Sequence, residues 1–487
     1  MTFLTPYRNT LLRYLLTALM SFAVRAPANS SVDLRLLDSN IIHTPLAVSF
    51  ESPLLFDFDS PLACSLVKPT WIKVFDTTTE IPVPGRLICE SNRLFFVPAM
   101  QLSWYTNNHS QMPAAKSWQG LRAGHFYRAE LSSDIATEDA SVKFASMMFE
   151  FAMEPVDYGT IWFNADGLGE RQFKNIKNPF IVTKSPTIVI IQGRQELAVK
   201  DGMYRNNPFL KEFWNVQSEN LLTAWKARGF NTGVMFWEQF SDESEPKAIE
   251  AKLWSVPSLH SPGIPYLNAF AKRAFLKSKA HLADLLCNNY MESIRNIEPS
   301  DLRVIGHSVG TQVAIHCAWR SINSYPNIPP PNRIVLLDSF WGKGARSFLG
   351  NIWIGAVSTT ELSEVIAHSQ PAVEQYKSSP LGGLVGDSNL PIRKHTAFVR
   401  LWPNFLHGWA VGGRHNFSLS WYLESILAPV PVRNNDASLG AAASDSSVQQ
   451  LSNKPSAPMH LFSVMSGSVT SSPSDDVLEM DPGVTTW

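Results

Sequence analysis

The sequence of 487 residues lacks the patterns that mark several large functional classes. It has no internal repeat, no phosphate-binding loop, no complete G-x-G-x-x-G fingerprint and no H-E-x-x-H motif. Its formal net charge is only −1, so no general field draws the chain to nucleic acid, and we expect no nucleic-acid partner. No pattern indicates a cofactor or a metal ion. With 45% hydrophobic and 17% charged residues, the composition is that of a globular protein with more than one domain.

Cysteine is scarce, and no two of the four cysteines have the C-x-x-C spacing of zinc or redox sites. Cys64 and Cys89 lie in one β-rich region, where they could form a local disulfide in an oxidising compartment. Four buried free thiols, including Cys287 and Cys317, are the alternative.

The amino terminus carries an apolar run that is too short to span a bilayer. Arg8 and Arg13 precede about a dozen apolar residues, and the sequence RAPA follows them. This order is typical of a cleaved secretory signal, so we predict a signal peptide over residues 1–28 and a mature chain that starts near Asn29. We therefore expect a secreted, cell-surface or periplasmic protein. An uncleaved anchor or an ordinary helix is the alternative.

Residues 29–155 are predicted to form a small β-sandwich domain. Short segments such as WIKVFD, RLFFVPA and HFYRAEL are rich in Val, Ile, Phe and Tyr, and turn residues separate them. Several such strands without a long helical pattern favour a sandwich. The segment resembles the bacterial Ig-like domains of exported proteins, which implies a spacer or docking role.

Residues 156–430 show an alternating pattern of strands and helices. Continuous apolar runs, as in SPTIVIIQG, LRVIG and NRIVLLDSFW, are typical of buried parallel strands. Helical spacing between the runs predicts an α/β fold with a mostly parallel sheet and helices on both faces. Residues 431–487 are rich in Ser, Ala, Pro and Asp without periodicity, so we predict a disordered tail.

A serine between two glycines marks the point where a predicted strand becomes a helix. In GHSVG, Ser308 follows LRVI and precedes TQVAIHCAW. The G-x-S-x-G pattern occurs by chance in many chains, but this context is that of a nucleophile elbow. The turn would expose the Ser308 hydroxyl and place the N–H of Val309 near a developing oxyanion.

A nucleophilic serine needs a histidine base and a carboxylate that orients it, in the chain order serine, acid, histidine. Asp338 ends a predicted strand and is the expected acid, with Asp387 and Glu361 as alternatives. His415 begins a helical segment after the last predicted strand and is the expected base, with His407 as the competitor. The remaining later histidines are His316, His368 and His395.

These residues carry a resemblance to the animal pancreatic-lipase family of α/β-hydrolases, over residues 185–429. The elbow VIGHSVGTQVAIHCAWRS and the strand PNRIVLLDSFWG are similar to the family's patterns. The histidine segment matches it at His415, Ser418, Trp421, Tyr422, Ser425 and Ile426. The resemblance implies that the backbone N–H groups of Arg194 and Val309 form the oxyanion hole, because Gln192-Gly193-Arg194 stands where the family has His-Gly-Phe.

The chain departs from that family in two further respects. No cysteine lies between Asp338 and His415, so the lid disulfide is absent, and no carboxyl-terminal lipid-binding domain is evident. Residues 350–390 could be a lid or a plain surface excursion.

The sequence thus predicts a secreted, lipase-like serine hydrolase of acyl esters with a lipid-like substrate. Transient contact with a membrane or lipid interface is left open. The alternatives are a catalytically silent lipase-fold binding or surface-attachment protein, or another serine acyl hydrolase such as a thioesterase or peptidase.

Overall fold

A computed structural model describes residues 33–102, 118–139, 142, 144–200, 208–209, 221–257, 261–298, 301–381, 386–433, 435–452, 461–464 and 471–481. The predicted signal peptide lies outside these residues. The chain forms two compact units, the first with residues 1–98 and 124–154 and the second with residues 99–123 and 155–487. Within the described helices, none is long and apolar enough to cross a membrane.

The first unit consists of two antiparallel sheets. In one, β5 (Arg93–Leu102) pairs with β2 (Leu54–Phe58) on one side and β4 (Gly85–Glu90) on the other, and β1 (Leu36–Ser39) pairs with β2. The other has the order β3 (Ile72–Asp76), β7 (Phe126–Leu131), β8 (Met147–Ala152). Phe56 of β2 and Phe149 of β8 lie 6.4 Å apart between their ring centroids, so the sheets pack face to face. A disulfide joins Cys64 and Cys89, the bridge that the sequence left open.

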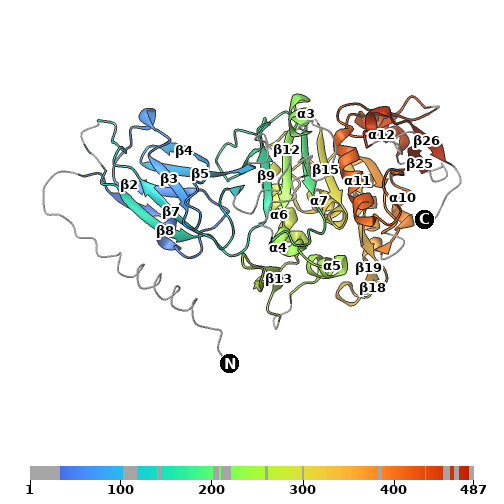
Figure 1. Cartoon of the computed structure of the whole chain (residues 1–487), viewed down its shortest axis with the longest axis horizontal. Coiled ribbons are helices and arrows are strands. Elements are labelled where there is room, and N and C mark those ends of the chain that lie inside the picture. The colour runs from blue at the N-terminus through green and yellow to red at the C-terminus, as the bar shows by residue number, and fades with distance from the viewer. Residues whose placement is uncertain are drawn as a thin grey trace. The chain divides into compact units, whose positions relative to one another are not determined.

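The second unit is built on a large sheet whose central strands are parallel, as predicted for an α/β-hydrolase fold. The parallel strands, in spatial order, are β12 (Asn231–Phe236), β11 (Thr187–Ile191), β15 (Leu302–His307), β16 (Arg333–Leu337), β20 (Ala372–Lys377), β22 (Ala397–Arg400) and β25 (Leu461–Val464). Antiparallel strands continue it at both sides, namely β9 (Gly159–Phe163), β10 (Leu168–Arg171) and β26 (Leu478–Asp481). The prediction of a mostly parallel sheet is confirmed (Figure 1).

Helices cover both faces of this sheet. The connection through α7 (Gly310–Ser324) and the one through α8 (Ile354–Ser369) run across the sheet in one direction, whereas the one through α3 (Leu221–Ala227) runs in the other. Because such crossovers are right-handed, α7 and α8 share one face and α3 lies on the other. The helix α6 (Leu282–Ile294) packs on α7, and α11 (Val411–Glu424) packs on α3 through Trp225 and Tyr422.

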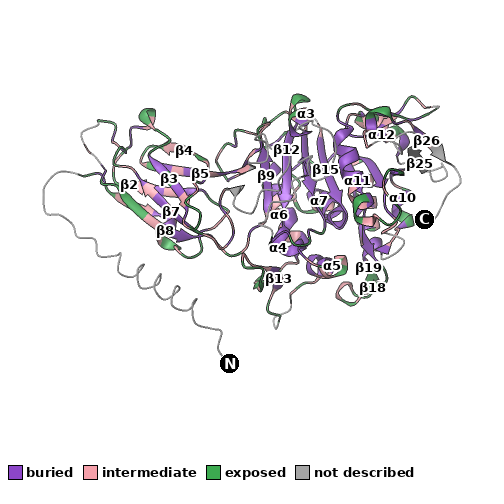
Figure 2. Ribbon diagram, in the orientation of Figure 1, coloured by how far each residue is buried: buried purple, intermediate pink, exposed green. Residues whose placement is uncertain are grey.

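The central strands are largely apolar because both faces of the sheet are covered. Every residue of β11, β12, β15 and β16 is buried, as Figure 2 shows for the middle of the sheet. A second disulfide, Cys287–Cys317, joins α6 to α7 within this core. Shorter elements complete the unit: α4 (Glu238–Ser241), α5 (Pro246–Trp254), β13 (Ile264–Leu267), β14 (Arg273–Leu276), β17 (Trp341–Gly342), β18 (Ala345–Arg346), β19 (Ile352–Trp353), β21 (Gly386–Asp387) and α10 (Leu390–Arg393).

Residues 350–390 are not a separable insertion. They contain α8 and β20, and β20 pairs with β16 on one side and β22 on the other, inside the sheet. The strand β20 was not evident from the sequence, because AVEQYK carries three polar residues, Glu374, Gln375 and Lys377, and no continuous apolar run. All six residues are nevertheless buried.

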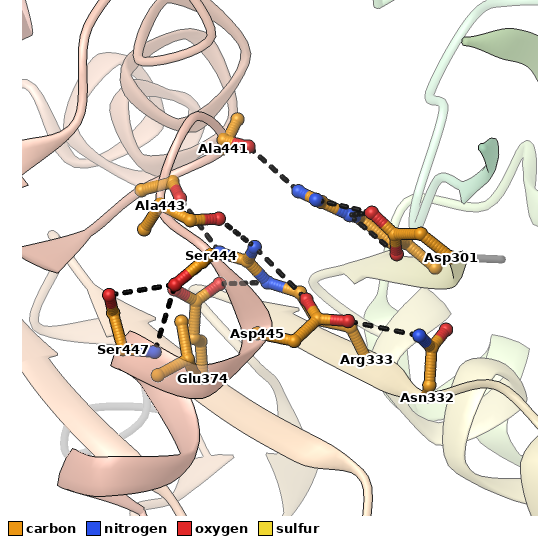
Figure 3. Close-up of polar contacts among 12 residues, drawn as sticks. Asp301, Asn332, Arg333, Glu374, Ala441, Ala443, Ser444, Asp445 and Ser447 are labelled. Atoms are coloured by element: carbon orange, nitrogen blue, oxygen red, sulfur yellow. Dashed lines mark hydrogen bonds and ion pairs between the residues drawn. The ribbon is translucent and has the colours of Figure 1, made fainter.

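The prediction of a disordered tail is wrong for the described residues after Val430. They form β23 (Val430–Pro431), β24 (Ser438–Leu439), α12 (Asp445–Leu451), β25 and β26. Buried arginines hold this segment, since Arg333 donates to the carbonyls of Gly440 and Ala443 at 2.7 Å each and Arg303 donates to Ala441 at 2.7 Å (Figure 3).

Candidate active site

Ser308 lies in the sharp turn between β15 and α7. Its φ angle is 57°, a left-handed conformation that is costly for a residue with a side chain. Hydrogen bonds hold the turn on both sides, because the Ser308 N–H donates to Leu337 at 2.9 Å and its carbonyl accepts the N–H of Phe340 at 3.2 Å. The hydroxyl of Thr311 donates to the same carbonyl at 2.7 Å. The elbow predicted from GHSVG therefore has the expected strand, turn and helix.

The two glycines of GHSVG and Gly193 are needed because backbones pass close to one another here. A Cβ on Gly306 would lie 2.4 Å from Cα of Thr311, and a Cβ on Gly310 would lie 2.3 Å from the carbonyl oxygen of Ile191. A Cβ on Gly193 would lie 2.5 Å from Cβ of Ser308 and 2.9 Å from N of Val309. The loop after β11 thus touches the elbow itself.

This contact brings the two proposed oxyanion donors to the elbow. Within the described residues, neither the N–H of Arg194 nor that of Val309 donates to a backbone carbonyl. The loop is held by the carboxylate of Asp242, which accepts the N–H groups of Leu197 and Val199 at 2.7 and 2.9 Å. Free N–H groups beside a nucleophile can stabilise negative charge that develops on a substrate oxygen.

Asp338 and His415, far apart in the chain, are in direct contact. Nδ1 of His415 lies 2.6 Å from Oδ2 of Asp338. Asp338 follows β16 directly, and His415 lies in the second turn of α11. Among the described residues, no hydrogen bond joins Ser308 to His415. The two residues are nevertheless near each other, because the ring of His307, the residue before Ser308, has its centroid 4.6 Å from that of His415. Such bonds are often long in free enzymes and shorten when substrate binds.

His307, the residue before Ser308, supports the histidine rather than titrating itself. Its Nε2 lies 3.1 Å from the carbonyl oxygen of His415, so the ring carries its proton on that nitrogen and donates it. Burial, together with the neighbouring His415 ring, lowers the pKa of His307 to about 3. The ring is therefore neutral at physiological pH, and no positive charge from it opposes protonation of His415.

Three residues that were not evident from the sequence contact the acid and the base. Lys377, Ser378 and Ser379 follow one another at the end of β20, and all three are buried. Nζ of Lys377 lies 3.2 Å from Oδ1 of Asp338, and the Ser379 hydroxyl donates to Oδ2. Burial by itself would raise the pKa of Asp338, but Lys377, His415 and Ser379 outweigh it and hold that pKa well below its usual range.

The alternative acids and bases are engaged elsewhere. Glu361 lies 2.8 Å from Nδ1 of His316, and Asp387 accepts the N–H of Asn389 at 2.8 Å. The ring of His407 stacks on Trp409 with centroids 4.1 Å apart. His395 Nε2 lies 3.3 Å from the Ser363 hydroxyl, and His368 lies in the last turn of α8.

One cluster has the residue types of a metal site. The ligand atoms of His281, Asp284 and His316 lie within 4.8 Å of one another. However, Nδ1 of His281 accepts the Asp284 N–H, so its Nε2 carries the proton and has no lone pair to offer a metal. Burial lowers the pKa of His316, but Asp284 and Glu361 outweigh burial and raise it to about 9. The cluster is thus arranged as an ion-pair network around a charged imidazolium.

Comparison with known proteins gives distant likenesses only. No family model and no curated protein matches the chain. Among solved structures, the N-terminal part of the bacterial S-layer protein SbsC is 11% identical, with a TM-score of 0.18, over 32% of this chain and 31% of that one. A thermostable esterase is 10% identical, with a TM-score of 0.21, over 69% and 81%. A hyperthermophilic esterase from the archaeon Pyrobaculum calidifontis is 11% identical, with a TM-score of 0.26, over 55% and 82%. Likenesses at this level do not indicate a function, so the interpretation rests on the geometry of the chain itself.

Proposed function

We propose that the chain is a serine ester hydrolase that works through an acyl-enzyme. The observation that carries this proposal is the 2.6 Å contact between His415 and the buried Asp338, at the sheet edge where Ser308 occupies a strained elbow. A nucleophile elbow, a histidine and an orienting carboxylate at one edge form the set of groups that acyl transfer by serine requires.

In the proposed reaction, Oγ of Ser308 attacks the ester carbonyl carbon while Nε2 of His415 takes the hydroxyl proton. Asp338 holds the proton on Nδ1 of His415 and stabilises the imidazolium that forms. The tetrahedral intermediate collapses, His415 gives its proton to the leaving alkoxide, and an alcohol departs. Water then attacks the acyl-Ser308 ester in the same way, which releases the carboxylic acid and restores the serine.

The oxyanion of each intermediate would accept hydrogen bonds from the N–H groups of Arg194 and Val309. Each such donor contributes about 3 kcal/mol to transition-state stability in related chemistry. The close approach of Gly193 to Ser308 supports this assignment, because it brings the loop that carries Arg194 against the elbow.

We further propose an apolar, lipid-like acyl ester as the substrate. Three aromatic side chains in the segment before α11 are exposed: Trp402, Phe405 and Trp409, at 36%, 40% and 67%. They lie within 13 residues of His415 along the chain. Exposed aromatic rings suit contact with an acyl chain or a lipid interface.

The test is activity-based labelling together with ester hydrolysis. The purified mature chain should react with a fluorophosphonate probe at Ser308 and cleave nitrophenyl esters, with kcat/KM rising as the acyl chain lengthens. Ser308→Ala is the control and should show neither property. An unlabelled wild-type chain would mean a catalytically silent fold, and faster cleavage of a thioester or peptide than of the matched ester would redirect the proposal to those substrates.

Export from the cytoplasm is proposed on two grounds. The first is the basic and apolar order of residues 1–28. The second is that all four cysteines form disulfides, Cys64–Cys89 and Cys287–Cys317, and such bonds persist in oxidising compartments. Expression of the full chain with its leader should yield a mature product that begins near Asn29, as read by intact mass. A cytoplasmic product with the leader retained would contradict this proposal.

A further inference from the structure

The end of β20 places a lysine against the acid of the proposed triad. Lys377 is 4% exposed and Asp338 1% exposed, so both charges are removed from water. A buried carboxylate without a counter-charge is unstable by several kcal/mol and takes up a proton instead. The ammonium group 3.2 Å from Oδ1 supplies that counter-charge.

The two oxygens of Asp338 have different partners. Oδ1 faces Lys377 and accepts the backbone N–H groups of Ser378 and Ser379 at 3.3 Å each. Oδ2 faces Nδ1 of His415 and accepts the hydroxyl of Ser379. Residues at the strand end therefore hold both oxygens, and Oδ2 is the one that also contacts the base.

Ser378 between them fixes the helix that carries the base. Its hydroxyl donates to the carbonyl of Arg414 at 2.6 Å and accepts the N–H of Ser418 at 3.2 Å. These two backbone positions flank His415 on either side. Three consecutive residues thus contact the groups of the proposed triad: Lys377 and Ser379 bind the carboxylate of Asp338, and Ser378 binds the backbone on either side of His415.

We propose that Lys377 is a positioning residue whose charge, in contact with Asp338, lowers the affinity of the Asp338–His415 pair for its catalytic proton. This inference rests on the proposed function. A positive charge beside Asp338 opposes a second one on His415, and the two groups titrate as a pair because they share one hydrogen bond.

The other charged or titratable groups near the pair do not replace Lys377. His307 on β15 stacks near His415 but is neutral. Arg400 is the register partner of Lys377 on β22, and its guanidinium lies 4.7 Å from the ring centroid of Trp402. The guanidinium of Arg414 on α11 donates to the carbonyls of Pro403, Leu406 and His407. Lys377 is the cation in contact with Asp338 among these.

The experiment compares pH profiles of kcat/KM for ester hydrolysis by the full mature chain. Lys377→Met removes the charge and keeps the length of the side chain. Its acid limb should move to higher pH by about one unit, because the pair then holds its proton more tightly. Lys377→Arg keeps the charge and should leave the limb near the wild-type position. Lys226→Met removes a half-buried ammonium elsewhere in the unit, one that donates to the carbonyl of Phe180, and should not move the limb.

Ser379→Ala is the second variant, for the case in which Lys377→Met does not fold. It removes one hydrogen bond to Oδ2 and should move the acid limb in the same direction by a smaller amount. An unmoved limb in folded Lys377→Met, even with a lower kcat or melting temperature, would overturn the inference, as would an unmoved limb in Ser379→Ala when Lys377→Met cannot be obtained. A wild-type chain without esterase activity or probe labelling would instead refute the proposed function.

Discussion

The neighbouring strands β16 and β20 are joined by a buried ion pair at each end, and the two pairs have different surroundings. At the amino end, Arg333 and Glu374 are each fully buried and 2.8 Å apart. At the carboxyl end, Asp338 and Lys377 are almost as buried and 3.2 Å apart. Both pairs bridge the same neighbouring strands, and both place charge where a β-strand is normally apolar.

The ends differ in what completes the network. At the amino end, backbone carbonyls of Gly440 and Ala443 and the carboxylate of Asp445 close around Arg333 (Figure 3). At the carboxyl end, Oδ2 of Asp338 contacts His415, whose side chain is 14% exposed. A closed network stabilises the fold, whereas an open one keeps a charge available to a group that can exchange protons with a substrate. The same pairing thus has a structural role at one edge and, in the proposed function, a positioning role in catalysis at the other.

The largest expected effect that separates the two ends is on activity. Asp338→Asn should lower kcat for ester hydrolysis about 10⁴-fold, because the amide no longer holds the required tautomer of His415. Glu374→Gln at the other end should leave kcat of the folded protein near the wild-type value. Steady-state kinetics of both variants test this, and a kcat for Asp338→Asn within tenfold of wild type would remove Asp338 from the triad.

The next effect concerns stability at the amino end. Arg333→Met should lower the free energy of unfolding by about 3–5 kcal/mol, because Glu374 is left buried without its partner. The exposed pair Arg433–Glu479 offers a matched control, and Arg433→Met should cost about 0.5 kcal/mol or less. Urea denaturation measures both. Equal losses in the two variants would show that the amino-end network is not specially stabilising.

A third prediction tests how closely the carboxyl end depends on backbone contact. Gly193→Ala should lower kcat/KM roughly 10²-fold or more, because the new Cβ meets Ser308 and displaces the loop after β11 that carries Arg194. Gly412→Ala places its Cβ in open space and should have little effect. Kinetics with one nitrophenyl ester suffice. Full activity in Gly193→Ala would contradict the placement of Arg194 beside the elbow.

The smallest effect concerns Asp476, through which the carboxyl-terminal segment also contacts α11. Its carboxylate accepts the indole N–H of Trp421 at 2.7 Å, and burial raises the pKa of Asp476 to about 6. The folded protein therefore binds this proton more tightly than the unfolded chain does, and stability falls as pH rises from the unfolded pKa towards 6.

Asp476→Asn keeps the acceptor and removes the charge, so its melting temperature should exceed that of wild type by a few degrees at about pH 8 and match it below about pH 4. Thermal unfolding at both pH values checks this, with the exposed Asp134→Asn as control. A variant that is less stable than wild type at the higher pH would reverse the assigned sign.

The predictable parts of the fold are those in which a local residue pattern is compatible with only one kind of structure. The runs TIVII and RIVLL can be stable only between two layers, and both are buried parallel strands. The elbow glycines Gly306 and Gly310 allow contacts of 2.4 and 2.3 Å that any side chain would block. Ser308, Asp338 and His415 were selected on such local grounds, and the last two lie together at the edge where Ser308 turns.

The parts that were not predictable depend on distant partners. The sequence of β20 is polar, and its charged residues can be buried because Glu374 pairs with Arg333 and Lys377 pairs with Asp338. Neither partner is near β20 in sequence. The segment from Gly440 to Ala443 has the composition of a disordered tail, and its order depends on hydrogen bonds that Arg303 and Arg333 donate to its carbonyls. The pairing of Cys287 with Cys317 likewise needs α6 and α7 side by side.

The sequence by itself determined the class of the fold and the position of the elbow, because periodicity and steric limits act locally. Only the tertiary structure decided which buried charges meet and which oxygen of Asp338 remains for His415. The reason is that an ion pair in a low-dielectric interior is stable only when both partners and their hydrogen bonds arrive together, and no single segment contains them all.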